Sequence, residues 1–163
     1  MVQSLVVVLT LLVGAGALLK GLSWARRERI VRAIDPATVV RVARGVSLRI
    51  LTQGPTTLPG MNPDRANRTI GDFVLTADRF LIGSSRGVLV DVQPGRPRLR
   101  SIRSTGPGRL VIEGATPGAT GPGGSYRIEL VIDDAEAWAS ALAPFADEAQ
   151  VAQIPRRAAE GRA

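Results

Sequence analysis

Apolar residues follow two different patterns along the chain. A continuous apolar run extends from Leu5 to Leu19 without a charged side chain, and the stretch from Val2 to Trp24 is about 23 residues long with Lys20 as its one charge. A helix of about 20 such residues spans the hydrocarbon core of a bilayer. Beyond residue 34, apolar positions recur in short alternating runs bounded by glycine and proline, which is typical of strands. The pattern predicts one membrane helix followed by one β-rich domain.

The apolar run is interpreted as a membrane anchor. The side chains that we expect to contact lipid are Leu5, Val8, Leu12, Leu19 and the interfacial Trp24. A cleaved signal peptide is the alternative, because Ala15-Gly16-Ala17 resembles a small-residue cleavage site. A signal peptide carries its cations before the apolar core, whereas here they follow it. The position of the cations therefore favours an anchor that stays attached.

Positive charge gathers at one end of the apolar run. The cations that we expect to contact anionic lipid head groups are Lys20, Arg26, Arg27, Arg29 and Arg32. Flanks rich in lysine and arginine stay in the cytoplasm, and each cation near an anionic leaflet contributes about 1 kcal/mol. The N-terminus is therefore predicted to lie outside and the domain on the cytoplasmic face.

One face of the predicted membrane helix carries small residues at spacings of four, three and four. They are Thr10, Gly14, Ala17 and Gly21. Small residues let two membrane helices approach closely, although glycine and alanine are also frequent in such helices for other reasons. The face predicts homo- or hetero-oligomerisation, by self-association or by docking on a larger membrane complex.

Composition restricts the chemistry of the chain. It contains no cysteine and no histidine, and its single lysine is Lys20 at the membrane edge. Thiolate chemistry, an imidazole base, a histidine zinc ligand and a P-loop or Schiff-base lysine are thereby excluded. We expect no enzyme activity, no cofactor and no metal. The net charge of +7 is not accompanied by aromatic residues interleaved with the cations, so we expect no nucleic-acid partner.

The soluble part is predicted to form six or seven strands and then one helix. Strands are expected at about residues 38–51, 72–76, 79–83, 88–92, 99–104, 109–113 and 126–132. A short helix is the alternative just after Asp35, which suits an N-cap, because Pro36 suits a first helical turn. Residues 52–68 and 115–124 are rich in proline, glycine and polar residues and are predicted to be loops.

The apolar period changes from two to about 3.6 after residue 132. Ala135, Trp138, Leu142 and Phe145 form one stripe of an amphipathic helix, and the preceding Asp133-Asp134 is expected to cap it. The tail is predicted to be disordered. The resulting organisation is a membrane helix with its basic flank at 1–34, a β domain at 35–146 and a tail at 147–163.

This order of strands followed by one helix resembles the pleckstrin-homology (PH) superfold. The segment 71–82, Gly-Asp-Phe-Val-Leu-Thr-Ala-Asp-Arg-Phe-Leu-Ile, looks like the hairpin of bacterial PH-like and GRAM domains, and residues 88–92 and 99–102 resemble the strand and the step that follow it. The resemblance covers roughly residues 38–146. It implies a mainly β (α+β) fold, in which a PH-like antiparallel β-barrel with a C-terminal capping helix follows the transmembrane helix in a bacterial plasma (inner) membrane.

The resemblance also implies where a ligand would bind. PH domains that recognise phosphoinositides use basic residues around the loop between their first two strands. Here that predicted loop contains Arg65 and Arg68, and Arg49 lies on the strand before it, although the lysine that opens the usual motif is missing. The predicted function is a noncatalytic, membrane-tethered binding or scaffolding module with an unknown protein partner. An accessory single-pass subunit of a larger membrane complex is the alternative.

Overall fold

The described residues form one curled, eight-stranded sheet with one short α-helix. The structure is a computed structural model that describes residues 34–93, 99–106, 108–116 and 123–150, together with 21 and 25. The order of the strands in the sheet is β4-β3-β2-β1-β7-β6-β5-β8. The strands are β1 (Val39–Gln53), β2 (Ala66–Thr76), β3 (Phe80–Ser84), β4 (Gly87–Val92), β5 (Leu99–Ser104), β6 (Arg109–Thr116), β7 (Gly124–Val131) and β8 (Ala146–Gln150). The mainly β class predicted from the sequence is thus confirmed.

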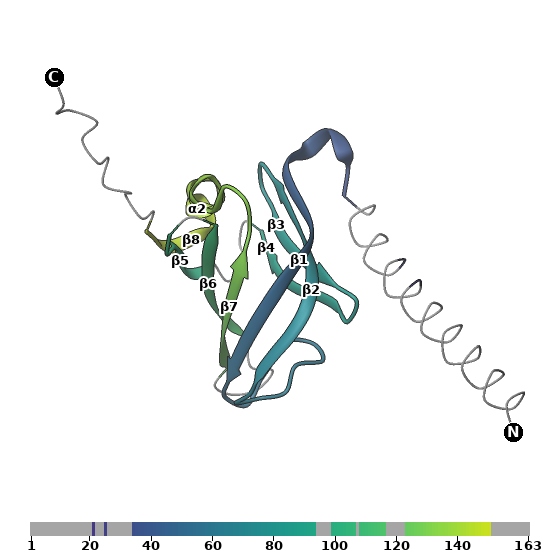
Figure 1. The fold of residues 1–163 in the computed structure, drawn as a ribbon, viewed down its shortest axis with the longest axis vertical. Coiled ribbons are helices and arrows are strands. Elements are labelled where there is room, and N and C mark those ends of the chain that lie inside the picture. Colours follow the sequence, from purple (N-terminus) through teal and green to yellow (C-terminus); the bar gives the residue numbers. More distant parts are fainter. Residues whose placement is uncertain are drawn as a thin grey trace, which may run out of the picture.

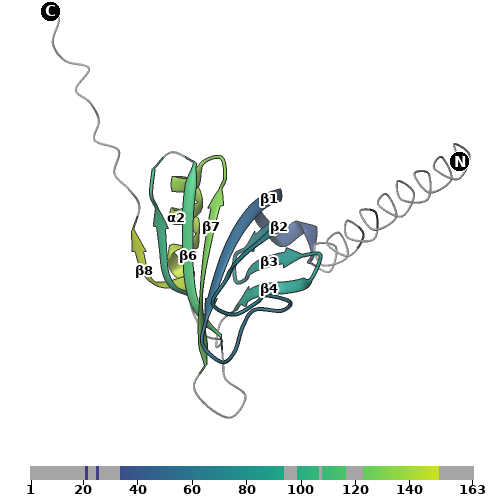
Figure 2. The same ribbon diagram turned by 60° about the horizontal axis from the view of Figure 1, so that its bottom comes forward.

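The sheet bends into two halves that meet where β1 lies beside β7. Figures 1 and 2 show β1 to β4 on one side and β5 to β8 on the other, with the helix α2 (Ala135–Leu142) lying close to the second half. The helix contacts β5, β6 and β8. The hydrogen-bonded strand order is linear from β4 to β8, so the sheet is a half-barrel with two edges.

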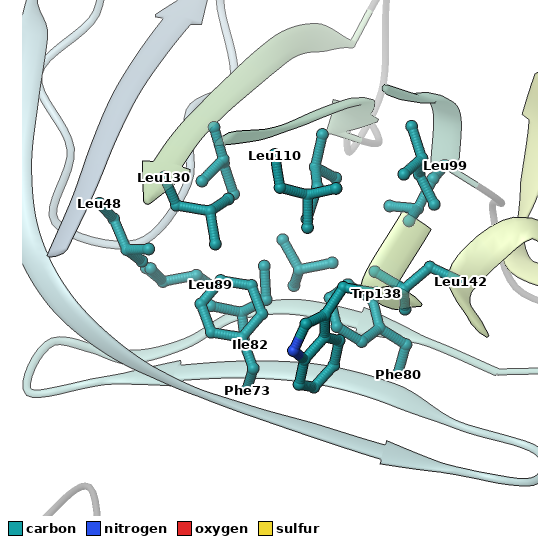
Figure 3. Close-up of a cluster of buried hydrophobic side chains, with 14 of the residues drawn as sticks. Leu48, Phe73, Phe80, Ile82, Leu89, Leu99, Leu110, Leu130, Trp138 and Leu142 are labelled. Atoms are coloured by element: carbon teal, nitrogen blue, oxygen red, sulfur yellow. The ribbon is translucent and has the colours of Figure 1, made fainter. Parts of the chain in front are cut away.

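The core fills the space between the two halves and the helix. Figure 3 shows Leu110 and Leu130, from the half formed by β5 to β8, facing Phe73 and Phe80, from the half formed by β1 to β4. Phe73 lies at the centre, with ring centroids 6.1 Å from Phe80 and 6.1 Å from the edge-on Trp138. Burying one large apolar side chain contributes about 1.5–3 kcal/mol, so this cluster stabilises the contact between α2 and the sheet.

A β-bulge in β1 reverses which side chains face the core. Ala43 pairs with Phe73 and Val46 with Gly71, so two residues of β1 oppose the single Asp72. Gly45 adopts a left-handed φ of +68° and donates its N–H to Asp72 Oδ1 at 2.7 Å. Beyond the bulge the even-numbered residues of β1 point inward. Before it, the even-numbered Val42 is 46% exposed on the outer face.

The chain joins the sheet directly after the predicted anchor. Ile34 is buried against Val74 and Leu81 on the outer face of β2 and β3. Asp35 Oδ1 accepts the N–H of Ala37 at 3.0 Å and starts one 3₁₀ turn, η1 (Pro36–Thr38), after which β1 begins. The N-cap expected at Asp35 and the expected strand therefore both occur. The cap begins the 3₁₀ turn, and the strand begins directly after that turn.

The anchor itself lies almost entirely outside the described residues. Of the positions predicted for it only Gly21 is described, and it is exposed with no atom within 4 Å of where a Cβ would lie. In the described part of the chain no helix has the length and apolarity needed to cross a bilayer. The lipid-facing, basic and small-residue positions between residues 5 and 32 otherwise stay predictions.

Three local expectations differ from the structure. Strand β2 starts at Ala66, because the side chain of Asn67 donates to the carbonyls of Asn62 and Arg65 and so fixes the start of the strand. Residues 147–150, expected in a disordered tail, continue β8, which pairs with β5 in parallel rather than antiparallel fashion. Asp134 occupies the N-cap of α2, but in a left-handed conformation and without a side-chain cap.

Candidate functional site

A groove of about 610 Å³ crosses the outer face of the sheet over β2, β1, β7 and β6. We call it the arginine groove, because four arginines line it against a single acid. The charged lining residues are Arg49, Arg68, Arg109, Arg127 and Glu129. The lining thus carries an excess of positive charge, and an anion is the complementary ligand.

Strand register brings three of these charges into one row. Arg49 of β1 lies opposite Arg68 of β2 on one side and opposite Glu129 of β7 on the other. All three side chains point away from the core, because the intervening residues of β1 are buried. Like charges directly opposite each other destabilise a sheet, and an anion beside them relieves the repulsion.

The acids on this face are already occupied by arginines. Glu129 binds Arg49 at 3.0 Å and Arg127 at 2.9 Å, and Glu113 binds Arg103 at 3.0 Å and Arg127 at 3.6 Å. These pairs are partly exposed, and such salt bridges contribute about 0–1 kcal/mol each. These salt bridges therefore add little stability, and their main effect on the groove is to hold the carboxylate of Glu129 in ion pairs.

Two groove arginines are left without an acid partner. The side chains of Arg68 and Arg109 make no ion pair or hydrogen bond with the part of the chain that the structure describes. A free guanidinium presents a rigid fork of N–H donors that matches the oxygens of a phosphate or carboxylate. These two residues are the groups in the groove that are available to an external anion.

Exposed aliphatic side chains lie beside these free arginines. Ile70 is 51% exposed and Val131 is 70% exposed. Ile70 is opposite Ser47 in the β1–β2 register, and Val131 is opposite Arg109 in the β6–β7 register. We call Arg68, Ile70, Arg109 and Val131 the outer patch. The outer patch therefore combines two cations that have no acid partner among the described residues with two exposed aliphatic side chains.

The residues proposed from the sequence are only partly brought together. Arg49 and Arg68 both line the groove, but Arg68 stands on β2 and not in the preceding loop. Arg65 is exposed just before β2 and does not line the groove. Sequence reasoning did not identify Arg109 and Arg127, because only the pairing of β1 with β7 and β7 with β6 brings them to this face.

The groove also contains hydroxyl groups and one acid. Ser47 and Thr105 supply its hydroxyl groups, and the only acid in the lining, Glu129, is held by two arginines. No group of three or more acidic residues within the described ranges is arranged to hold a metal ion. Burial raises the pKa of Tyr126, but this side chain lies in the core and does not line the groove. The described lining of the groove therefore offers guanidinium and hydroxyl groups beside one acid that is held in ion pairs.

Comparison with known proteins adds no relative. No protein family matches the sequence, and no curated protein is significantly similar to it.

Proposed function

We propose that this protein is a noncatalytic, membrane-tethered binding and scaffolding module of PH-like type on the cytoplasmic face. The N-terminal helix holds it in the bilayer, and the outer patch docks on anionic lipid head groups of the same membrane. The observation that carries the proposal is the pairing of two unpartnered arginines, Arg68 and Arg109, with two exposed aliphatic residues, Ile70 and Val131.

The composition of the outer patch suits a lipid interface. Arginines bind the phosphates of anionic lipids at about 1 kcal/mol per cation. The aliphatic side chains gain free energy when they leave water for the boundary between head groups and acyl chains. A small soluble phosphate compound would use the arginines but not Ile70 and Val131, which are more than half exposed. The combination therefore favours a lipid surface.

The junction with the anchor supports the same orientation. Ile34 is fixed against Val74 on the outer face of the sheet, which is the face that carries the outer patch. From Val74 to Arg68 is six residues of β2, or about 20 Å of strand. A tether that ends on this face keeps the patch near the bilayer, where a high effective concentration makes weak contacts sufficient.

The PH-like assignment is supported by the order of the elements. Seven antiparallel strands in the order β4-β3-β2-β1-β7-β6-β5 precede the helix, which covers one end of the core. The additional parallel strand β8 departs from the pattern that the sequence suggested. Because one fold hosts many activities, the binding function rests on the outer patch and not on the fold.

An accessory subunit of a membrane complex is the second candidate. The observation that favours it is the exposure of Val40, at 65%, and Val42, at 46%, close to the junction with the anchor. These residues would contact a neighbouring subunit whose helix packs on the small-residue face. Replacing Gly14 and Gly21 with leucine would dissociate such a complex and leave lipid docking by the domain unchanged.

The test of docking uses the full chain in nanodiscs. The natural chain has no cysteine, so the variant Ile70→Cys takes one environment-sensitive fluorophore at the outer patch. We expect a blue shift with phosphatidylglycerol, little shift with phosphatidylcholine alone, and loss of the shift at high salt or in the Arg68→Ala/Arg109→Ala background. A fluorophore on Ser140→Cys, exposed on α2, is the matched control. Equal spectra of the Ile70 label in both lipids would contradict docking.

A further inference from the structure

A second cleft, of about 550 Å³, opens where β1 and β7 separate. Strand β1 pairs with β2 from Val39 to Leu51, but with β7 only from Leu48 to Gln53. Within the described residues, the edge of β1 between Arg41 and Ser47 that faces away from β2 therefore has no strand partner. Figure 1 shows β1 and β7 adjacent at one end and apart at the other.

The opposite wall of the cleft is set by the end of β7 and the start of α2. It consists of residues 131–134 and Trp138. The N–H of Ile132 bonds to the carbonyl of Gly108 at 2.9 Å, and Asp134 then turns with a φ of +56° to begin the helix. The chain thus leaves the sheet before it can pair with the rest of β1, and the gap is part of the fold.

Two arginines and two acids line the cleft, and they differ in whether their side chains have a contact. The Arg41 guanidinium lies 5.3 Å from the centre of the Trp138 ring, and Arg44 also has an interaction within the protein. Asp133 and Asp134 are exposed, and neither side chain has a partner among the described residues. A ligand that enters the cleft therefore meets an open strand edge and two free carboxylates.

We propose that an extended segment of a partner protein adds to the free edge of β1 as an extra strand and places a basic side chain against Asp133 and Asp134. Strand addition satisfies main-chain donors and acceptors that an open edge exposes, and the flanking side chains select the sequence. The apolar side chains of the segment would face Val46 and Trp138 in the lining. This site goes beyond lipid docking and does not depend on it.

The probe is a capped peptide of alternating valine and lysine, added to the full chain in neutral detergent micelles. We expect slower hydrogen exchange at residues 41–47 and a change in Trp138 fluorescence, measured in a Trp24→Phe background. A peptide of equal charge with proline at alternate positions is the control, because it has too few N–H donors to pair. Unchanged exchange at saturating peptide, or an equal response to the proline peptide, would overturn strand addition.

Charge selection is tested with the double variant Asp133→Asn/Asp134→Asn. We expect the valine–lysine peptide to bind about fivefold more weakly, which corresponds to the loss of one charge-assisted contact. A valine–glutamate peptide should bind the natural chain less well than the lysine peptide. Stronger binding of the glutamate peptide would contradict the basic partner.

Closing the cleft gives an independent test. One more step of the β1–β7 register beyond Leu48 and Leu130 would place Ser47 opposite Val131, so the variant Ser47→Cys/Val131→Cys can join the two walls. The oxidised protein should lose peptide binding and the reduced protein should regain it. Equal binding in both states would show that the peptide does not enter between the strands.

Discussion

Arg49 and Arg68 stand directly opposite each other on the outer face of the β1–β2 pair. Glu129 binds Arg49 but not Arg68, so the repulsion between the two arginines is only partly relieved inside the protein. This arrangement costs stability and gains an anion-binding group. Replacements at Arg68 should therefore move stability and lipid binding in opposite directions.

The variant Arg68→Glu tests this opposition. We expect it to raise the free energy of unfolding by roughly 0.2–1 kcal/mol, because an opposite-charge pair replaces a like-charge pair. The same change should abolish salt-dependent docking on phosphatidylglycerol nanodiscs. Denaturant unfolding and the nanodisc fluorescence assay measure the two effects. Loss of stability together with unchanged docking would refute the role of Arg68.

The bulge of β1 gives a prediction about stability. In Asp72→Ala the N–H of Gly45 loses the acceptor that it has at 2.7 Å, which should cost about 1–3 kcal/mol. Asp133→Ala is the matched control, because its exposed carboxylate has no partner in the described residues, and it should change stability by less than about 0.5 kcal/mol. Equal effects of the two variants on denaturant unfolding would show that Asp72 does not hold the bulge.

The burial of Tyr126 should make the stability of the protein depend on pH in the alkaline range. Its side chain packs where a Cβ on Gly114 would clash with it, and burial raises the pKa of the phenol in the folded state. The unfolded chain loses this proton above about pH 10 while the folded chain keeps it. The stabilising contribution is therefore complete below about pH 10 and falls by about 1.4 kcal/mol per pH unit above it.

The variant Tyr126→Phe should remove this decline. Every other titratable group is present in both proteins and cancels from the comparison. Denaturant unfolding of both proteins across pH 8 to 11 gives the difference. If the free energies of unfolding of the two proteins fell in parallel with rising pH, groups other than Tyr126 would be responsible for the loss of stability.

The cations that follow the predicted anchor indicate a membrane topology in which the N-terminus lies outside and the domain lies in the cytoplasm. A cysteine placed at Ser140 on α2 should react with a membrane-impermeant maleimide only after cells are permeabilised, whereas one placed at Gln3 should react in intact cells. Labelling of the Ser140 position in intact cells would place the domain outside and overturn the cytoplasmic assignment.

Much of the sheet was predictable, because alternation of apolar residues is local information. The run Gly124–Val131 shows it clearly, because every second residue is buried, and the stripe through Trp138 indicated the helix. The start of β2 was not predictable, because Asn67 holds it through hydrogen bonds to a loop. Nor was β8, whose pairing with β5 joins residues more than forty positions apart.

The candidate site was less predictable than the fold. Arg49 and Arg68 belong to neighbouring strands and were identified together, whereas Arg65, which was predicted with them as a ligand contact, does not line the groove. Arg109 reaches the groove through the β6–β7 register, which a single sequence does not encode in any local pattern. The bulge at Gly45 had a comparable effect, because it places Val42 on the outer face although the even-numbered residues beyond it point inward.

The most direct measurement is the depth of the outer patch in the bilayer. A nitroxide on Val131→Cys, in the full chain in phosphatidylglycerol nanodiscs, is compared with one on Ser140→Cys for collision with oxygen and with a water-soluble nickel complex. The account predicts that the Val131 nitroxide favours oxygen and is shielded from nickel, while the Ser140 nitroxide is open to nickel. Equal exposure of both nitroxides to nickel would contradict docking of this face on the membrane.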